Sequence, residues 1–396
     1  MKRRDVLLGG AAGLILSGPS MAQTIQRQRH PVRRPGVYVE ELPSQTHTIE
    51  AQPTDVALFI GAFSPRFPTG THRTITSFNS LPLGFRGANI AARMFFEAGG
   101  QTLILINAAH RDDGTADFDA ALASLENTDA PQFNLLLLVG AEDLYGDDPT
   151  RLAGLYQTAA EAARSRYAHL LIEAPEQATG HQGWRDALGL DDPDMAAWAP
   201  HLKGHGENDF TPGPAIAGLI AASDQNRGVW KAPAGVNAIL PGYNASIALS
   251  NSQVDEMAMA HINPIREMRG VATLWGARTL SSDPEWKYLP VRRAARWIEH
   301  SLSKGLEWTA FEPNDEPLWA QIRSSVDGFM NGLFREGAFQ GSNAQNAYFV
   351  HCGLGQSMTQ NDLDLDLGRV VVEIGFAPIR PAEFIVLRLL LPAGSD

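Results

Sequence analysis

The sequence predicts an α/β layered core domain over residues 54–250, followed by an α+β C-terminal domain over residues 251–380. Strand-like and helix-like segments alternate from residue 54 to about residue 240, an order typical of an α/β domain with a largely parallel sheet. Further along, long helices are followed by strands, as in an α+β domain. Extended arms are expected at both ends.

Apolar segments and turn residues define the elements of the first domain. Residues 135–139 are apolar at every position, as expected of a strand covered on both faces. Gly99 and Gly100 end the first helix. Residues 177–212 are rich in Gly, Asp, Pro and His, which predicts a loop or surface excursion. The predicted strands are residues 56–62, 102–107, 135–139 and 170–173, and the helices are residues 90–98, 118–125, 152–166 and 214–222.

The second domain begins with two helices. The longer one has Leu318, Ile322 and Val326 at helical spacing, with Asn314 or Asp315 as its candidate N-cap. The other predicted elements are a helix at residues 291–304, a strand-like segment at 306–311, and strands at 348–352, 369–376 and 384–391.

Each predicted arm carries a short strand. Because a lone strand leaves its backbone groups unpaired, it must join another sheet, in its own chain or in a neighbour. If each subunit donates a strand to the next without closure, the product is a helical or tubular polymer. The residue pattern leaves both alternatives open. The arm of residues 23–53 contributes Val37, Tyr38, Val39, Glu40 and Glu41, and the arm of residues 381–396 contributes Phe384, Ile385, Val386, Leu387 and Leu389.

Charge and composition limit the function. The formal net charge is -12, whereas residues 1–34 hold seven basic side chains and one acidic one. The acidic remainder repels nucleic acid phosphates, so we expect no nucleic-acid partner. No internal apolar run is long enough for direct membrane insertion. Cys352 is the only cysteine, which excludes an intrachain disulfide and a multi-cysteine zinc site.

Residues 1–22 have two interpretations. Arg3 and Arg4 precede an apolar run of signal length, which is typical of an export signal of the twin-arginine type. Alternatively, translation starts at Met21 and residues 1–20 are a spurious upstream extension. The first alternative predicts export, and the second fits assembly in the cytoplasm.

No catalytic constellation is recognisable. The chain has no G-x-S-x-G elbow and no Walker A loop. His201 and His205 lie in a glycine-containing loop without an evident third ligand, so we expect no metal site there. The alternating Asp362, Asp364 and Asp366 are better explained as a solvated acidic face than as a cation site. We therefore expect no catalytic residues, no metal and no cofactor.

Several strings resemble contractile phage tail sheath proteins, the family that includes tailocin and contractile injection system sheaths. Residues 35–41 (PGVYVEE), 228–235 (GVWKAPAG) and 305–319 (GLEWTAFEPNDEPLW) match motifs of that family, and residues 262–266 and 381–385 add two shorter matches in family order. The matching positions include Trp230, Lys231, Pro233, Trp308, Glu312, Pro313, Asn314 and Trp319, for which we expect roles in core packing and turn geometry.

The resemblance implies a structural subunit that polymerises as stacked rings around an inner tail tube protein. On a baseplate signal such a sheath shortens and drives the tube through a target cell envelope. Other implied partners are further copies of the chain, baseplate proteins and tail terminator proteins. The resemblance also implies that the two arms are exchanged between subunits, with residues 23–35 and the segment around Arg380 and Pro381 as hinges.

Two other functions are considered. The export-like signal and the layered domain are compatible with an exported α/β hydrolase-like enzyme. A non-contractile scaffold protein with a sheath-like fold is the third possibility. Deleting residues 23–42 separates them, because only a sheath loses a polymer while its monomer stays folded.

Overall fold

The computed structural model describes residues 47–392 of the chain in part, and residues 1–46 lie outside the description. The predicted strand at residues 37–41, His205 and the acidic run with Asp362, Asp364 and Asp366 therefore lie outside the described residues. The described stretches are residues 47–108, 116–126, 131–177, 179–204, 208–360, 368–379 and 385–392.

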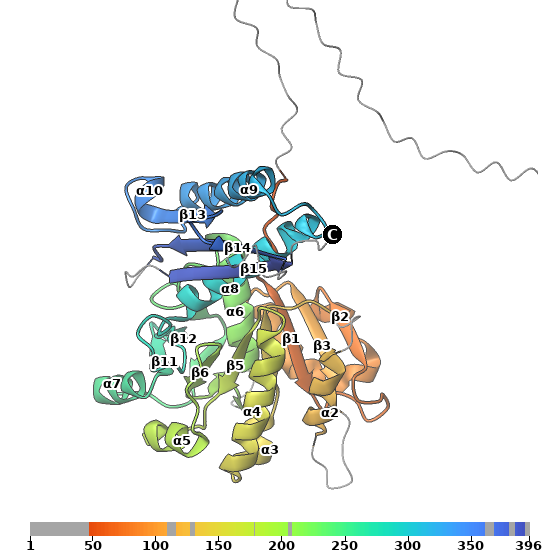
Figure 1. The fold of residues 1–396 in the computed structure, drawn as a ribbon. Helices are drawn as coiled ribbons and strands as arrows, with labels where there is room; N and C mark the ends of the chain where they lie inside the picture. Colours follow the sequence, from red (N-terminus) through yellow and green to blue (C-terminus); the bar gives the residue numbers. More distant parts are fainter. Residues whose placement is uncertain are drawn as a thin grey trace, which may run out of the picture. The chain divides into compact units, whose positions relative to one another are not determined.

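A nine-stranded sheet with the order β2-β3-β1-β4-β5-β6-β11-β12-β9 forms the centre of the structure (Figure 1). Its six central strands, β3 to β11 in this order, are parallel, and β2, β12 and β9 are antiparallel to their neighbours. This confirms the prediction of a mixed α/β fold with a largely parallel sheet. The strands are β1 (Val56–Gly61), β2 (His72–Ile75), β3 (Thr102–Asn107), β4 (Leu135–Leu138), β5 (His169–Glu173), β6 (Met195–Ala199), β9 (Ile239–Leu240), β11 (Ile262–Met268) and β12 (Val271–Leu274).

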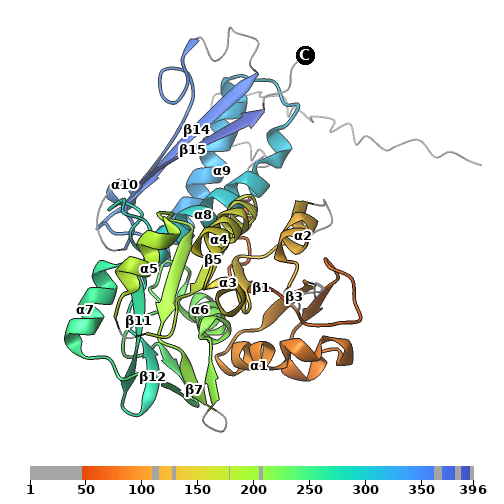
Figure 2. The same cartoon turned by 90° about the horizontal axis from the view of Figure 1, so that it is seen from below.

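Helices cover both faces of this sheet (Figures 1 and 2). Alternation along β1 shows the two sides, since Ala57 and Phe59 belong to one apolar core and Leu58 and Ile60 to the other. The first core includes α1 (Asn89–Glu97) and α6 (Gly213–Arg227). The second includes α2 (Phe118–Ala123), α3 (Ala141–Tyr145), α4 (Pro149–Arg164), α5 (His181–Leu188) and α7 (Asn251–Met259).

The C-terminal elements form a third core. Helices α8 (Leu289–Gly305) and α9 (Glu316–Arg335) pack with a three-stranded antiparallel sheet. Asp315 accepts a hydrogen bond from the Leu318 N–H and is thus the N-cap of α9. The sheet comprises β13 (Tyr348–Cys352), β14 (Arg369–Phe376) and β15 (Ile385–Pro392), with α10 (Ala344–Ala347) before β13. A second small sheet has the order β10-β7-β8, with β10 (Tyr243–Ala245), β7 (Leu202–Gly204) and β8 (Asn208–Phe210).

The prediction of a loop at residues 177–212 was wrong. This stretch contains α5, β6, β7 and β8, and every residue of β6 is buried between β5 and β11. The strand was missed because its sequence, Met-Ala-Ala-Trp-Ala, is short and rich in alanine, which has low intrinsic strand propensity. Its position in the sheet decides its conformation.

The prediction of a strand-like segment at residues 306–311 was also wrong. A 3₁₀ turn occupies Glu307–Thr309, and the chain then reverses into α9. Leu306 and Thr309 are buried, so the apolar character of this segment reflects packing rather than strand pairing.

The division into domains at residue 250 remains a prediction. The pairing nevertheless places β11 and β12, which follow that residue, in the same sheet as β1 to β6. The elements that pack separately from this sheet begin with α8.

Candidate assembly interface

The three-stranded sheet presents two outer strands, β13 and β15, which flank β14. Neither β13 nor β15 has a second strand partner within the described part of the chain, so each offers one row of backbone groups to a further strand. β15 corresponds to the predicted C-terminal arm strand and pairs with β14 of its own chain, the first of the two alternatives that the sequence left open. In the backbone register, Ile385, Val386, Leu387 and Leu389 pair with Phe376, Gly375, Ile374 and Val372, while Phe384 lies outside the described residues.

The segment that enters from the N-terminal arm is anchored along α8. The His47 ring stacks on Trp308 with a centroid distance of 3.9 Å and an interplanar angle of 16°. Ile49 is buried against Gly305, where a Cβ would come within 2.7 Å of the isoleucine side chain. The glycine therefore allows the segment to approach the end of the helix closely.

Hydrogen bonds continue this anchoring. The backbone N–H of Gln52 donates to Ser301 Oγ at 3.1 Å, and Trp297 Nε1 donates to the Gln52 carbonyl oxygen at 2.6 Å. Arg293 Nη2 donates to the Thr54 carbonyl oxygen at 3.0 Å. Because positions 293, 297, 301 and 305 lie four residues apart, they form one face of α8, and residues 47–54 follow that face.

A buried carboxylate joins α8 to the large sheet. Asp194 lies directly before β6 and is fully buried. Arg292 donates to it from Nε at 2.6 Å and from Nη2 at 2.9 Å, and Arg296 donates from Nη2 at 2.8 Å. Arg164, the last residue of α4, adds a bond from Nε at 3.0 Å. Burial alone would raise the pKa of Asp194, but the bonds and charges of Arg292 and Arg296 outweigh it and hold that pKa well below its usual range.

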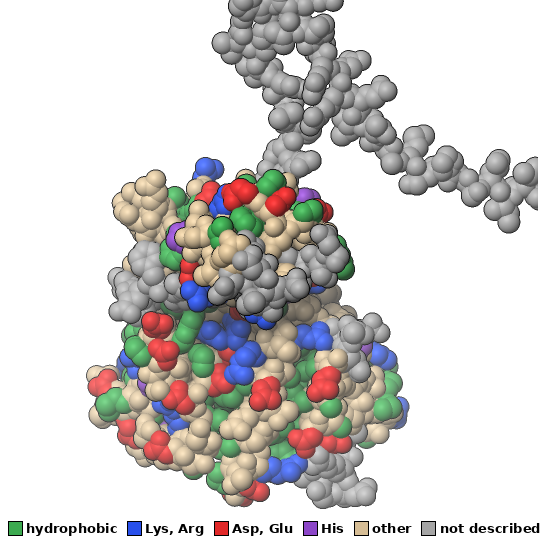
Figure 3. Space-filling view, in the orientation of Figure 1, with side chains coloured by type: hydrophobic (Ala, Val, Ile, Leu, Met, Phe, Trp, Pro, Cys, Tyr) green, Lys and Arg blue, Asp and Glu red, His purple; other side chains and the backbone are tan. Residues whose placement is uncertain are grey.

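A second buried ion pair joins α8 to α6. Arg293 donates to Asp224 from Nη1 at 3.1 Å and from Nη2 at 2.6 Å, and both side chains are almost completely buried. The same guanidinium holds the Thr54 carbonyl oxygen. Figure 3 shows several Lys and Arg side chains gathered where the C-terminal elements meet the large sheet. Helix α8 therefore connects the entering segment, α6 and the sheet.

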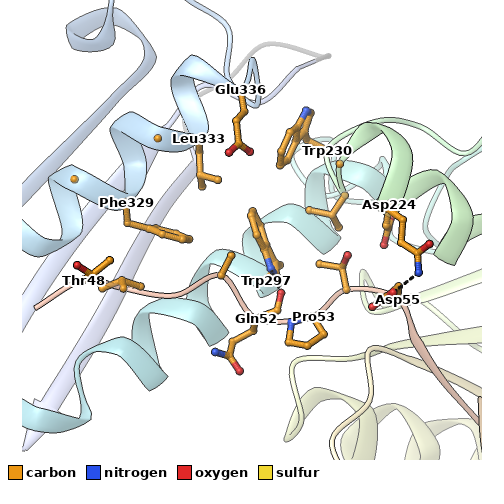
Figure 4. Close-up of a pocket in the computed structure, with 18 of the residues that line it drawn as sticks. Thr48, Gln52, Pro53, Asp55, Asp224, Trp230, Trp297, Phe329, Leu333 and Glu336 are labelled. Atoms are coloured by element: carbon orange, nitrogen blue, oxygen red, sulfur yellow. Dashed lines mark hydrogen bonds between the residues drawn. The ribbon is translucent and has the colours of Figure 1, made fainter. Parts of the chain in front are cut away.

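A groove of about 830 Å³ runs between residues 47–55, α8 and α9 (Figure 4). Trp230, Trp297 and Phe329 give it an aromatic lining, and the Trp230 and Trp297 rings lie 6.0 Å apart. Gly328 and Gly332 of α9 also line it, and a Cβ at either position would meet nothing within 4 Å. This side of α9 therefore has room for small additions.

Alanine at Gly332 should stabilise the folded chain. Glycine inside a helix costs roughly 0.5–1 kcal/mol relative to alanine, and the added methyl group meets open space here. We expect Gly332→Ala to raise the free energy of unfolding by about 0.5–1 kcal/mol in urea denaturation. Gly305→Ala is the control and should lower it, because its Cβ would come within 2.7 Å of Ile49. Equal effects of the two substitutions would contradict the packing described for Gly305.

The motif residues of the sequence lie in two places. Trp230 lines the groove, the Lys231 N–H closes a turn onto the Gly228 carbonyl oxygen at 3.0 Å, and Pro233 is buried. Their expected roles in packing and turn geometry remain predictions.

The other motif residues surround the turn between α8 and α9. Trp308 stacks on His47, and Trp319 Nε1 donates to Asn314 Oδ1 at 2.8 Å. Asn314 Nδ2 in turn donates to the Arg369 carbonyl oxygen at 3.3 Å, which ties the turn to the first residue of β14. Glu312 and Pro313 are exposed.

Sequence reasoning missed Asp194 and Phe311. The arginines at 292, 293 and 296 in a predicted helix were a usable signal for Asp194. Arg292 and Arg296 lie four residues apart and therefore share a face of the helix, where they must either reach solvent or pair with a buried carboxylate. Nothing local indicated which carboxylate would pair with them. Phe311 lies in the segment that the sequence predicts to be strand-like, whereas its side chain is 91% exposed.

Neither the single cysteine nor His201 belongs to a cluster of reactive side chains in the described residues. Cys352 is buried, and burial raises the pKa of its thiol to about 12, so the thiol stays protonated. His201 lies 3.6 Å from a Glu176 carboxylate oxygen. In the described stretches no helix has the length and apolar character needed to cross a membrane, and no three potential metal-ligating side chains come together.

A family model and the curated relatives of the chain agree on one family, the tail sheath proteins. A family model described as the phage tail sheath C-terminal domain matches residues 281–390. The tail sheath protein of Escherichia phage P2 is 28% identical over 179 residues, which cover 43% of this chain and 42% of that protein. The tail sheath protein of Enterobacteria phage T4 is 24% identical over 186 residues and 27% of its length. The chain thus matches less than half the length of these curated relatives.

Solved structures match over nearly the whole chain. The helical sheath of the anti-feeding prophage in its contracted state is 30% identical, with a TM-score of 0.72, over 90% of this chain and 98% of that chain. The sheath of the extracellular contractile injection system PVC, also in a contracted state, is 28% identical, with a TM-score of 0.72, over 91% of this chain and 98% of that chain.

These relatives are structural sheath proteins, and the mixed α/β fold with its large, parallel-rich sheet matches their structures. The chain belongs to the contractile tail sheath family.

Proposed function

We propose that the chain is the structural subunit of a contractile sheath. It polymerises as stacked rings around an inner tube and contracts to drive that tube through a target cell envelope. The observation that carries this proposal is the 30% identity, over 90% of the chain, to a helical sheath in its contracted state. The subunit acts by assembly and not as an enzyme, and it needs no cofactor, because the energy of contraction is stored in the lattice.

The two arms link neighbouring subunits in this proposal. Residues 37–41 of one copy add to the C-terminal sheet of another, and β15 exchanges from its own β14 to that of a neighbour. Support comes from the outer strands β13 and β15, which each have an unpaired edge in the described chain. Donation from copy to copy without closure gives an open helical polymer.

The proposed partners follow from the assembly. They are further copies of the chain, the inner tail tube protein, and baseplate and tail terminator proteins, with no nucleic acid and no direct membrane insertion. We place assembly in the bacterial cytoplasm, followed by incorporation in a phage tail or injection particle. Export through residues 1–22 is the alternative location.

Electron microscopy of the full chain, alone and with its tube protein, tests the proposal. We expect striated cylinders or stacked rings. A variant lacking residues 23–42 should give folded monomers of unchanged circular dichroism that no longer form cylinders. Small uniform particles from the full chain, with the tube protein present, would overturn the proposal. Rings that never shorten would indicate a non-contractile scaffold, and hydrolysis of ester substrates would favour the enzyme.

A further inference from the structure

Phe311 has two unfavourable features at once. Its side chain is 91% exposed, and its backbone has φ +72, in the left-handed region that bulky side chains avoid. Exposure of the ring and strain of the backbone both cost free energy in the isolated chain. A residue with both features at the end of a tight turn is expected to contact something in the assembled state.

Two exposed acidic residues follow Phe311 closely in the chain. Glu312 and Asp315 are exposed and form no ion pair with any residue in the described stretches. The neighbouring charges are already compensated, since Glu307 pairs with Lys304 at 2.8 Å and Glu316 with Arg323 at 2.6 Å. We call Phe311, Glu312 and Asp315 the acidic aromatic turn.

The turn lies at one end of the C-terminal sheet. Asn314 Nδ2 donates to the carbonyl oxygen of Arg369, where β14 begins. Arg369 pairs with Pro392, the last residue of β15. A strand that adds antiparallel to the outer edge of β15 therefore starts at this end, close to the acidic aromatic turn.

The chain contains a segment of complementary chemistry directly before its arm strand. Arg33 and Arg34 precede residues 37–41, and residues 1–34 carry seven basic side chains and one acidic one. A guanidinium group stacks on an aromatic face and donates to carboxylates simultaneously, which lysine does less well. Arg34 and Arg33 lie three and four residues before Val37, about 10–14 Å of extended chain, so the arginines stay near the strand's start.

We propose that the acidic aromatic turn receives Arg33 and Arg34 of a second copy of the chain. This inference rests on the proposed exchange of arm strands and adds the contact that fixes where the incoming strand begins. The strain and exposure at Phe311 are then features of the free subunit that the contact in the polymer offsets.

Phe311→Gly tests the aromatic part. Glycine accepts a positive φ, so the melting temperature of the monomer should stay equal or rise, whereas the critical concentration for polymerisation should rise about tenfold or more. Arg269→Gly is the matched control, because Arg269 is also exposed with φ +56 and lies away from the C-terminal sheet. It should relieve strain without changing assembly. Unchanged assembly of Phe311→Gly would overturn the proposal.

Charge reversal tests the partner. Glu312→Arg and Arg34→Glu should each raise the critical concentration several-fold. Mixing the two variants should restore polymers, since each arm then finds a turn of opposite charge on the other copy. If the mixture stays defective while the double variant assembles, the contact lies within one chain and the proposal is wrong.

Different results would overturn the sheath function and the contact of the acidic aromatic turn with Arg33 and Arg34. If the wild-type chain never forms cylinders, the sheath function itself is overturned, and this inference with it. If the wild type polymerises and none of the variants of the turn or of Arg34 changes the critical concentration, only the contact proposed here is excluded.

Discussion

Replacing Asp194 by alanine should lower the free energy of unfolding by about 3–5 kcal/mol. The substitution leaves the guanidinium groups of Arg292 and Arg296 facing each other without their anion, and both are largely buried with 13% of each side chain exposed. Their mutual repulsion and lost solvation then destabilise the contact between α8 and the sheet. Urea denaturation followed by tryptophan fluorescence measures the change.

An exposed ion pair provides the control for Asp194. Asp119 pairs with Arg151 at 3.3 Å, and the two side chains are 59% and 43% exposed. Because exposed pairs contribute roughly 0–1 kcal/mol, Asp119→Ala should change stability by less than 1 kcal/mol. Similar small effects at both positions would show that α8 is held to the sheet by apolar packing alone.

We expect the free energy of unfolding to fall as the pH rises from about 5 to 7, because the buried Glu173 carboxyl then loses its proton. Glu173 ends β5, is 2% exposed, and accepts a bond from the Gly213 N–H at 3.0 Å. Burial raises its pKa from 4.5 to about 7, so the folded chain keeps a proton that the unfolded chain releases near pH 4.5. The stabilising contribution is complete below pH 4.5 and disappears as the pH rises through 7. A shift of this size corresponds to about 3 kcal/mol.

Glu173→Gln isolates this carboxyl from other titrating groups. The amide retains an acceptor for Gly213 and does not ionise, so the variant should gain on the wild type as the pH rises and be more stable at pH 8. His169, whose pKa burial lowers to about 3, acts in the opposite direction below pH 6.5 but is common to both proteins. A difference between the two proteins that does not vary from pH 5 to pH 8 would contradict the proton assignment.

The sequence predicted β1, β3, β4 and β5 correctly, because each is a short, strongly apolar run. β4 consists of four leucines, an apolar run whose short length favours a buried strand over a helix. β6 was not predicted because an alanine-rich segment is compatible with several conformations. It becomes a strand because it pairs with β5 on one side and β11 on the other. Residues 306–311, after α8, were wrongly predicted as a strand for a related reason. A buried turn and a buried strand can have equally apolar sequences, so composition alone does not distinguish them.

The interface was less accessible to sequence reasoning. The apolar run near the C-terminus predicted the strand that the structure has at Ile385–Pro392, whereas the predicted strand at residues 37–41 remains a prediction. The contact of His47 with Trp308, and the clustering of three arginines on Asp194, join residues far apart in the chain. Local patterns carry no information on such pairs, because the tertiary fold alone brings them together.

The attachment of residues 47–54 along one face of α8 also determines how this part of the chain resists mechanical load. The hydrogen bonds that Ser301 accepts and that Trp297 and Arg293 donate lie side by side along the helix, together with the buried Ile49 and the stacked His47. A force along the helix axis loads these contacts in shear, so several must break at once, whereas a force perpendicular to it would peel them one at a time. The segment therefore withstands tension best in the direction of α8, and in the proposed contractile lattice a pull in that direction would leave the segment attached.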